Sequence, residues 1–276
     1  MSTHKRHGID DLLYLMARLR DPVSGCPWDC EQDFRSLVPY TLEEVYEVVD
    51  TIERGDVGHL SEELGDLLFQ VVFYARVAEQ DGLFDFSTVV DGIVRKLLAR
   101  HPHVFPDGTL ESRRGPGEAP RESRVKEQWE TIKQEERNSK GKGHLLADIP
   151  VALPALVRAQ KIQKRVARVN FDWPDIGGVM AKTREEMAEL DGALASADPD
   201  AIADEIGDLL FCCVNLARHA GFDAETLLRR SVGKFERRFN RMEDLASALG
   251  TPLGECDAKA QDSLWRAAKD VDIPPA

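Results

Sequence analysis

Two sets of four acidic residues recur in this sequence with the same internal spacing. The first set is Glu44, Glu47, Glu63 and Asp66, and the second is Glu186, Glu189, Glu205 and Asp208. Corresponding members of the two sets are separated by a constant 142 positions. This constant offset shows that the chain contains an internal repeat. The repeat indicates common descent of the two halves and does not by itself indicate catalysis.

Each set is made of two pairs of acids whose members are three residues apart. On an α-helix, residues three apart lie on one face. Glu186 therefore shares a helix face with Glu189, and Glu205 shares one with Asp208. The short connection from about Ala195 to Asp200 favours an antiparallel hairpin in which the two pairs face each other. Converging carboxylates repel unless they are neutralised, and such hard oxygen ligands suit Mg²⁺, with Mn²⁺ as a possible substitute. Both sets are therefore candidate magnesium sites.

Other interpretations of the acids compete with a magnesium site. Acids on helices usually form solvated faces, and one Glu-x-x-Glu pair alone is weak evidence for metal. The apolar residues around Glu205 and Asp208 favour the metal, because unpaired acids are costly in a partly buried position. Gly207, between these acids, is unfavourable in a helix and suggests that something approaches the backbone closely. A di-iron site is disfavoured because no His follows three positions after the Glu residues.

Basic and aromatic residues also recur in both halves. The matched pairs are Lys96 with Arg100 and Lys234 with Arg238, then Trp129 with Lys133 and Trp265 with Lys269. Members of each pair are four residues apart and share one helix face. Opposite a bound metal, Lys and Arg can hold phosphate oxygens, and Trp can stack on a base. For any single pair, surface charge and a core indole are the simpler explanation.

The two halves differ at positions near the acids. Lys182 precedes the second acid set by one turn, and the first half has Tyr40 there. Asn215 lies two turns beyond the second set, and its counterpart is Phe73. Asn can hydrogen-bond a base edge or a ribose, whereas Phe cannot. We therefore expect the second half to carry most of any catalysis, and the first half to serve mainly in dimerisation or regulation.

Apolar residues at intervals of three and four predict helices throughout, and no stretch alternates as a strand does. Helices are expected over residues 9–20, 40–53, 61–80, 86–100, 121–137, 155–169, 179–195, 201–220, 224–249 and 263–269. Ser61 is a plausible N-terminus for the third helix and Ser87 a plausible cap for the fourth, and a loop is expected over residues 26–39. The pattern is typical of an all-α protein.

A polar segment marks the expected domain boundary. Residues 138–143 read Asn-Ser-Lys-Gly-Lys-Gly, which is the composition of a flexible linker. We therefore expect an N-terminal helical-bundle domain at residues 1–137, a linker at 138–149 and a C-terminal helical-bundle domain at 150–276. Each domain has an ordinary size.

The composition excludes several classes of protein. Of the 276 residues, 42% are hydrophobic and 31% are charged, and no apolar run approaches the roughly 20 residues of a membrane span. The N-terminus has no apolar core or cleavage site of a signal peptide, so we expect a cytoplasmic protein. A formal net charge of −13 disfavours nucleic-acid binding. Cys26 and Cys30 lack a second ligand pair, which disfavours zinc.

The chain resembles the MazG family of tandem-domain nucleoside triphosphate pyrophosphohydrolases over nearly its full length. The motifs that carry the resemblance are Glu-Glu-x-x-Glu, Glu-x-Gly-Asp-Leu-Leu-Phe, Lys-Leu-Leu-Ala-Arg-His-Pro-His-Val-Phe at 96–105 and Lys-Phe-Glu-Arg-Arg-Phe at 234–239. The resemblance implies an all-α NTP pyrophosphatase fold, a homodimer and Mg²⁺-dependent hydrolysis of nucleoside triphosphates to monophosphate and pyrophosphate. It also implies a catalytic metal set of Glu186, Glu189, Glu205 and Asp208, and nucleotide contacts from Lys182, Lys234, Arg238 and Trp265.

The residues fit that reaction. A divalent ion together with Lys and Arg can neutralise triphosphate charge while a carboxylate accepts a proton from the attacking water. Asn215, Lys269, Lys96 and Arg100 complete the candidate substrate-binding residues. Two alternatives stand beside this interpretation. One is a non-catalytic helical dimer that binds nucleotides or a regulatory protein partner, and the other is a pyrophosphohydrolase with a narrow substrate, such as dUTP or phosphoribosyl-ATP.

Overall fold

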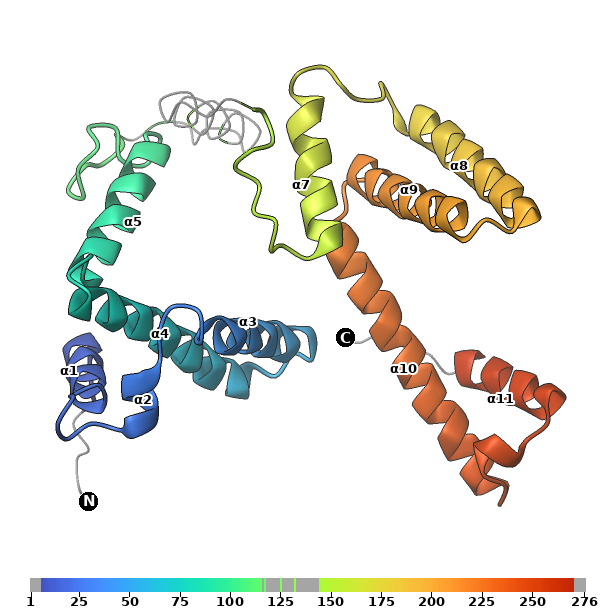
Figure 1. Cartoon of the computed structure of the whole chain (residues 1–276), viewed down its shortest axis with the longest axis horizontal. Coiled ribbons are helices and arrows are strands. Elements are labelled where there is room, and N and C mark those ends of the chain that lie inside the picture. The colour runs from blue at the N-terminus through green and yellow to red at the C-terminus, as the bar shows by residue number, and fades with distance from the viewer. Residues whose placement is uncertain (1–5, 116, 118–124, 126–131, 133–143, 271–276) are drawn as a thin grey trace. The chain divides into compact units, whose positions relative to one another are not determined.

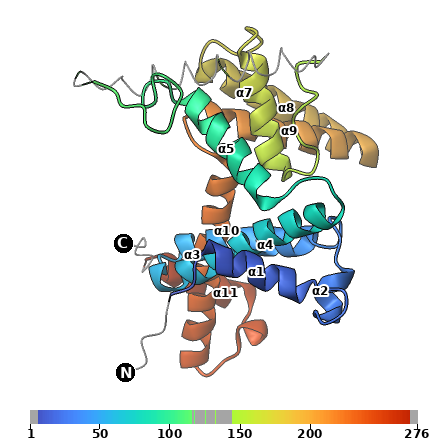
Figure 2. The same ribbon diagram turned by 90° about the vertical axis from the view of Figure 1, so that its left-hand side faces the viewer.

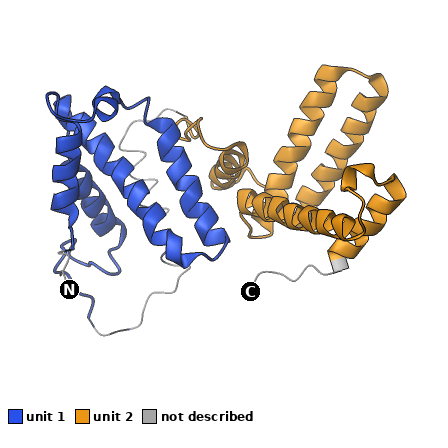
Figure 3. Ribbon diagram, turned by 90° about the horizontal axis from the view of Figure 1, so that it is seen from below, with its two compact units in different colours: residues 1–136 blue, residues 137–276 orange. Residues whose placement is uncertain are grey.

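The protein is all-α in the part of the chain that the computed structural model describes, which is residues 6–115, 117, 125, 132 and 144–270 (Figure 1). Within these residues there are helices and connecting turns but no strand. The predicted fold class is confirmed. The chain divides into two compact units, residues 1–136 and 137–276 (Figure 3). None of the described helices combines the length and the apolar character that crossing a bilayer requires.

The N-terminal unit is built around a helical hairpin. Its described helices are α1 Ile9–Leu19, α2 Pro27–Glu31, α3 Val38–Glu53, α4 Val57–Gln80 and α5 Phe86–Arg100. The helices α3 and α4 pack side by side, and α1 packs against α4 (Figures 1 and 2). A core of fully or almost fully buried side chains joins them, made of Met16, Leu37, Val72, Phe73 and Val77. The first acid set lies on the two helices of the α3–α4 hairpin.

The C-terminal unit contains two helical hairpins. Its elements are α7 Ala155–Ala167, α8 Ile176–Ser196, α9 Pro199–His219, α10 Ala224–Ala248, the 3-10 turn η1 Leu253–Glu255 and α11 Ala258–Asp270. The helices α8 and α9 form the first hairpin, α7 packs on α9, and α10 with α11 forms the second hairpin. Between α8 and α9 the chain reverses at Ala197, whose φ of 54° is left-handed, and Asp198 caps α9. The tight turn fixes the two helices face to face.

Several predicted boundaries differ from the structure. The expected loop over residues 26–39 contains the short helix α2, which begins at Pro27, where a proline is tolerated because the first-turn N–H has no helical acceptor. The helix α4 begins at Val57 instead of Ser61, and Asp56 caps it. Asp85, not Ser87, caps α5 by accepting a hydrogen bond from Thr88 N at 2.7 Å. The helix expected over 121–137 falls almost entirely outside the described residues.

Candidate metal and nucleotide site

The α8–α9 hairpin brings three acids of the second set together. One carboxylate oxygen from each of Glu186, Glu205 and Asp208 lies within 4.8 Å of the other two. The first acid is buried, the second half-buried and the third exposed. Because Mg²⁺ holds its oxygen ligands at about 2 Å in an octahedron, its ligand oxygens stand about 3 to 4 Å apart, which is close to the spacing of these three carboxylate oxygens. Its donor set therefore fits a magnesium ion.

The first acid set is arranged in the same way. Glu44 on α3 and Glu63 and Asp66 on α4 bring carboxylate oxygens within 4.8 Å of one another. Burial raises the pKa of Glu44 above its ordinary value, and repulsion from Asp66 and Glu47 adds to the increase. The acid geometry is thus present in both units, so the units cannot be ranked on the acids alone.

The remaining acid of each set lies beside its cluster. Glu189 and Glu47 do not belong to the groups of mutually close oxygens, but both act on them electrostatically. Burial raises the pKa of Glu189, Lys182 opposes the increase, and repulsion from Glu186 and Glu205 reinforces it. A carboxylate whose pKa is raised, and which lies beside the candidate metal ligands, is suited to accept a proton.

Lys182 neutralises the buried acid of the cluster. Its Nζ lies 2.8 Å from Glu186 and 2.7 Å from Glu185. These contacts, the one with Glu185 first, raise the pKa of Lys182. In the N-terminal unit the corresponding residue, Tyr40, packs its ring 5.4 Å from that of Trp28. Only the C-terminal acids therefore have a lysine on the preceding turn.

The raised pKa values of the clustered carboxyl groups predict that the metal-free protein is more stable at acidic pH than at neutral pH. Burial is the main cause for Glu44, Glu63 and Glu189. A folded state with raised carboxyl pKa values holds more protons than the unfolded state, so stability falls as pH rises from the ordinary carboxyl range through the raised values. In EDTA we expect the melting temperature to fall across this window, and Mg²⁺ at pH 7 to raise it by on the order of 5 °C.

Differential scanning fluorimetry at matched ionic strength measures both effects. Added Na⁺ is the control for general screening. An identical melting profile with Mg²⁺ and with EDTA at every pH would contradict a metal site at these acids.

The other predicted substrate residues lie elsewhere in the fold. Trp265 and Lys269 are on α11, which packs against α10 and lies apart from α8 and α9 in Figure 1. The Trp265 ring lies 5.4 Å from that of Phe235 on α10. Lys234 is exposed and Arg238 is half-buried on α10. One chain therefore does not bring α11 to its own acid cluster.

The N-terminal counterparts are also separated from the acids along the chain. Lys96 is exposed and Arg100 half-buried on α5, which follows the C-terminal end of α4. The acids Glu63 and Asp66 are in the N-terminal half of α4. Among the described residues there is also no close approach at Gly207, because a Cβ built there meets none of their atoms within 4 Å.

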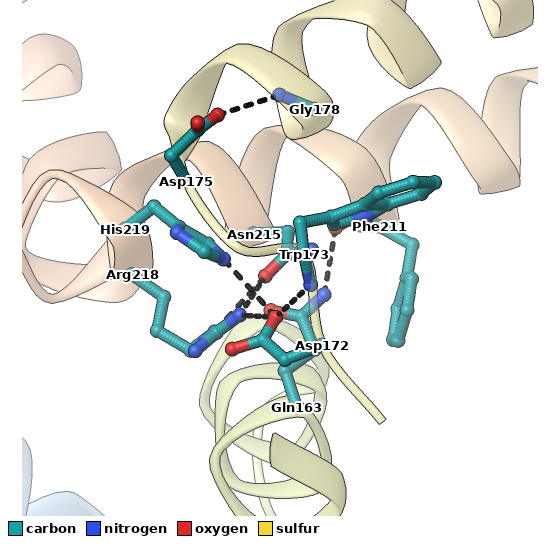
Figure 4. Close-up of polar contacts among 9 residues, drawn as sticks. All are labelled: Gln163, Asp172, Trp173, Asp175, Gly178, Phe211, Asn215, Arg218 and His219. Carbon is teal, nitrogen blue, oxygen red and sulfur yellow. Dashed lines mark hydrogen bonds and ion pairs between the residues drawn. The ribbon is translucent and has the colours of Figure 1, made fainter. Parts of the chain in front are cut away.

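Asn215 lies in a group of contacts that the sequence did not reveal (Figure 4). Its Oδ1 accepts hydrogen bonds from Arg218 Nε at 2.9 Å and Nη2 at 2.6 Å. Arg218 also pairs with Asp172, which precedes it by 46 residues. The only signal in the sequence is that Asn215 and Arg218 are three residues apart on one helix, and Asp172 had none.

The chain matches a family model in both units. The model describes the MazG nucleotide pyrophosphohydrolase domain, and it matches residues 32–105 and 177–242. These two ranges contain both acid sets. The matched segments also include Lys182, Asn215, Lys234 and Arg238.

Curated relatives match over nearly the full length. The nucleoside triphosphate pyrophosphohydrolase of Escherichia coli K12 is 48% identical over 96% of this chain and 98% of its own. The nucleoside triphosphate pyrophosphohydrolase/pyrophosphatase MazG of Thermotoga maritima is 40% identical over 95% of this chain and 96% of its own. An uncharacterized protein of Bacillus subtilis, YabN, is 37% identical over 96% of this chain and 52% of its own. The duplicated acid hairpin and these matches together show that the chain belongs to the MazG nucleotide pyrophosphohydrolase family.

Proposed function

We propose that this protein hydrolyses nucleoside triphosphates between the α and β phosphates, in a Mg²⁺-dependent reaction that releases nucleoside monophosphate and pyrophosphate. The observation that carries the proposal is the convergence of the Glu186, Glu205 and Asp208 carboxylates within 4.8 Å in a chain of this family. The names of the Escherichia coli and Thermotoga maritima relatives support the pyrophosphohydrolase activity.

The residues around the cluster have separate roles in this proposal. Glu186, Glu205 and Asp208 would hold the ion, which supplies Lewis acidity toward water and phosphate oxygens when bound. Glu189, whose pKa is raised, accepts the proton of the attacking water. Lys182 forms an ion pair with Glu186 at 2.8 Å. When Glu186 holds the metal ion instead, the Lys182 ammonium can turn toward a phosphate oxygen of the substrate.

We assign most of the catalysis to the C-terminal unit. Phe73, the counterpart of Asn215, is 1% exposed and belongs to the core of the N-terminal unit. Its ring lies 6.4 Å from Trp28, and the Arg20 guanidinium lies 5.3 Å from its centroid. An apolar ring locked in this way offers no hydrogen bond to a nucleotide. The N-terminal unit is then suited to dimerisation or regulation, with its acids as a further candidate metal site.

The direct test is pyrophosphate release from a mixed pool of nucleoside triphosphates. We expect release with Mg²⁺, a smaller or equal rate with Mn²⁺, and loss of release in EDTA that is reversed by excess metal, because the acid cluster alone repels the triphosphate. Single substrates, with dUTP and phosphoribosyl-ATP included, then separate a broad from a narrow enzyme. Absence of release at micromolar enzyme with either metal would favour the non-catalytic nucleotide binder.

We also propose a homodimer, because both units leave apolar stripes uncovered. On α10 the stripe consists of Leu228, Val232, Phe235 and Phe239, which are 38–55% exposed. On α4 and α5 the exposed apolar residues include Leu64, Leu68, Val71, Ile93 and Leu97. Their spacing of three and four residues is typical of helix packing. Contiguous apolar stripes of this kind mark interaction sites, and contact with a second copy of the chain would bury the stripes of both units.

The same dimer would complete the nucleotide site. Lys234 and Arg238 are on the helix that carries the α10 stripe, and Trp265 and Lys269 are on the helix packed against it. Because α11 lies apart from the acids of its own chain (Figure 1), we propose that α10 and α11 of one subunit reach the acid cluster of the other. Basic and aromatic side chains would then meet the triphosphate and base.

We also propose a cellular location and a domain organisation for this protein. We place the protein in the cytoplasm, and its five free cysteines support a reducing compartment. We propose domains at residues 1–137 and 150–276 joined by a linker at 138–149. The division into compact units between residues 136 and 137 supports this arrangement, and the contact of Arg165 on α7 with Asp148, at 2.6 Å, ties the end of that segment to the C-terminal domain.

A further inference from the structure

A cavity lies beside α9, two turns beyond the acid cluster. It has a volume of about 410 Å³, which is within the range of small-molecule sites. Residues of α7, of the segment that joins α7 to α8, and of α9 line it. The aromatic side chains of Phe171, Trp173 and Phe211 form part of its wall, and Gln163 and Asn215 are polar groups among them. A planar, partly polar ligand suits such a wall.

Gln163 contributes a hydrogen-bond acceptor without a partner. The residue is 3% exposed, and its Nε2 donates to the carbonyl oxygen of Phe211 at 2.9 Å (Figure 4). Since a carbonyl only accepts, this contact fixes which end of the amide is which. Its Oε1 is buried and has no hydrogen-bond partner among the residues that the structure describes. A buried acceptor left unpaired is costly, so it points to a donor supplied by a ligand.

Asn215 contributes a hydrogen-bond donor of fixed orientation. A guanidinium has donors only, so Arg218 must meet the amide oxygen, as the 2.6 and 2.9 Å contacts show (Figure 4). The Asn215 NH₂ is therefore the end that can serve a ligand. The cavity thus offers one acceptor and one oriented donor between aromatic rings.

Arg218 is itself held in place. Asp172 Oδ1 accepts a hydrogen bond from Arg218 Nη2 at 2.5 Å and lies 3.1 Å from His219 Nε2. Partial burial raises the pKa of Asp172, but hydrogen bonds from Arg218, His219 and the Trp173 backbone outweigh it, and the pKa lies below its ordinary value. The carboxylate therefore stays charged near pH 7. Asp172 and Arg218 act on a ligand through Asn215, so they are positioning residues.

The place of the cavity relative to the acids sets the class of ligand. Asn215 follows Asp208 by seven residues, which puts it on the same helix face about 10 Å along the axis. A phosphate chain held at Asp208 would extend its sugar and base along this face. We propose that the cavity binds the nucleobase of a nucleoside triphosphate, with Gln163 Oε1 accepting from a base N–H and Asn215 Nδ2 donating to a base acceptor. This inference rests on the proposed function.

The binding test separates the base from the phosphates. Calorimetry with Mg²⁺ compares an α,β-methylene nucleoside triphosphate with inorganic tripolyphosphate on the full chain. Asn215→Asp keeps an acceptor for Arg218 and replaces the amide donor with a second oxygen, whose added charge the Arg218 guanidinium neutralises. Gln163→Met removes the unpaired acceptor at similar volume, together with the hydrogen bond to the Phe211 carbonyl. We expect each variant to bind the nucleotide about tenfold more weakly while tripolyphosphate affinity stays within about twofold of wild type. Unchanged nucleotide affinity, or equal losses for both ligands, would overturn the proposal.

A kinetic test addresses the positioning residues. Asp172→Asn weakens the hold on Arg218, so we expect KM values to rise for the natural triphosphates while kcat changes little, and Asp172→Glu to restore KM. A merely structural role would lower kcat and thermal stability together, and this result would contradict the positioning role. If wild type binds the nucleotide more tightly than tripolyphosphate but releases no pyrophosphate, the proposed function fails and the base site stands. If wild type hydrolyses triphosphates and the variants bind normally, only the base site fails.

Discussion

Replacing Glu186 with glutamine lowers the rate of pyrophosphate release by about a hundredfold or more, whereas the matched change Glu44→Gln leaves most of the activity. Glutamine keeps the size of the side chain but removes the charge of the most deeply buried acid in the C-terminal cluster, which is 4% exposed. It also removes the charge from the ion pair with Lys182 at 2.8 Å, while Lys182 keeps its ion pair with Glu185. Steady-state pyrophosphate release at saturating Mg²⁺ measures the difference between the two units.

A second matched pair, Glu189→Ala and Glu47→Ala, removes the acids beside the clusters. We expect a large loss only for the first, because Glu189 is the group assigned to accept the proton. Melting curves in EDTA serve as the folding control for all four variants, since metal affinity does not contribute there. Equal losses in both units would contradict the assignment of catalysis to the C-terminal unit. Full activity in Glu186→Gln would contradict the metal site itself.

Placing two aspartates in the α10 stripe, as Leu228→Asp with Val232→Asp, separates the dimer into monomers. The wild-type side chains are 53% and 48% exposed in one chain, so their burial requires a partner. Burying such a side chain contributes about 1.5–3 kcal/mol, and both subunits carry the changes. We expect the dissociation constant to rise by about a thousandfold or more. Sedimentation over a range of protein concentrations measures this change.

Arg230→Asp is the matched control, because it changes the net charge by the same two units at an exposed position on the opposite face of α10. A dimer that survives both substitutions in the stripe would contradict an interface on α10. If the partner's α10 completes the site, mixing Glu186→Gln subunits with Lys234→Ala subunits restores roughly a quarter of wild-type activity, since half of the dimers are mixed and each has one intact site. No restoration after subunit exchange would place Lys234 with the acids of its own chain.

The local pattern of the sequence was enough to predict the helices and the acid hairpin. The intervals of three and four residues between apolar side chains follow from the helical period alone. They therefore predicted the all-α class and most helix boundaries. The pairing of Glu186 with Glu205 and Asp208 followed from two helices and a short turn. Caps were less predictable, because Asp56 and Asp85 compete with nearby Ser61 and Ser87, and the better-placed acceptor decides.

Relations between distant segments were decided only by the tertiary structure. Asp172 meets Arg218 across 46 residues, and Gln163 meets the Phe211 carbonyl across 48. No periodicity links such residues, because their contact depends on how α7 and the following segment pack on α9. The same holds for the position of α11 apart from the acids. The amino-acid sequence thus determined which side chains share a helix face, since that is set by backbone geometry within one element. Packing between elements determined which faces meet, which acceptor stays unpaired and where a cavity forms.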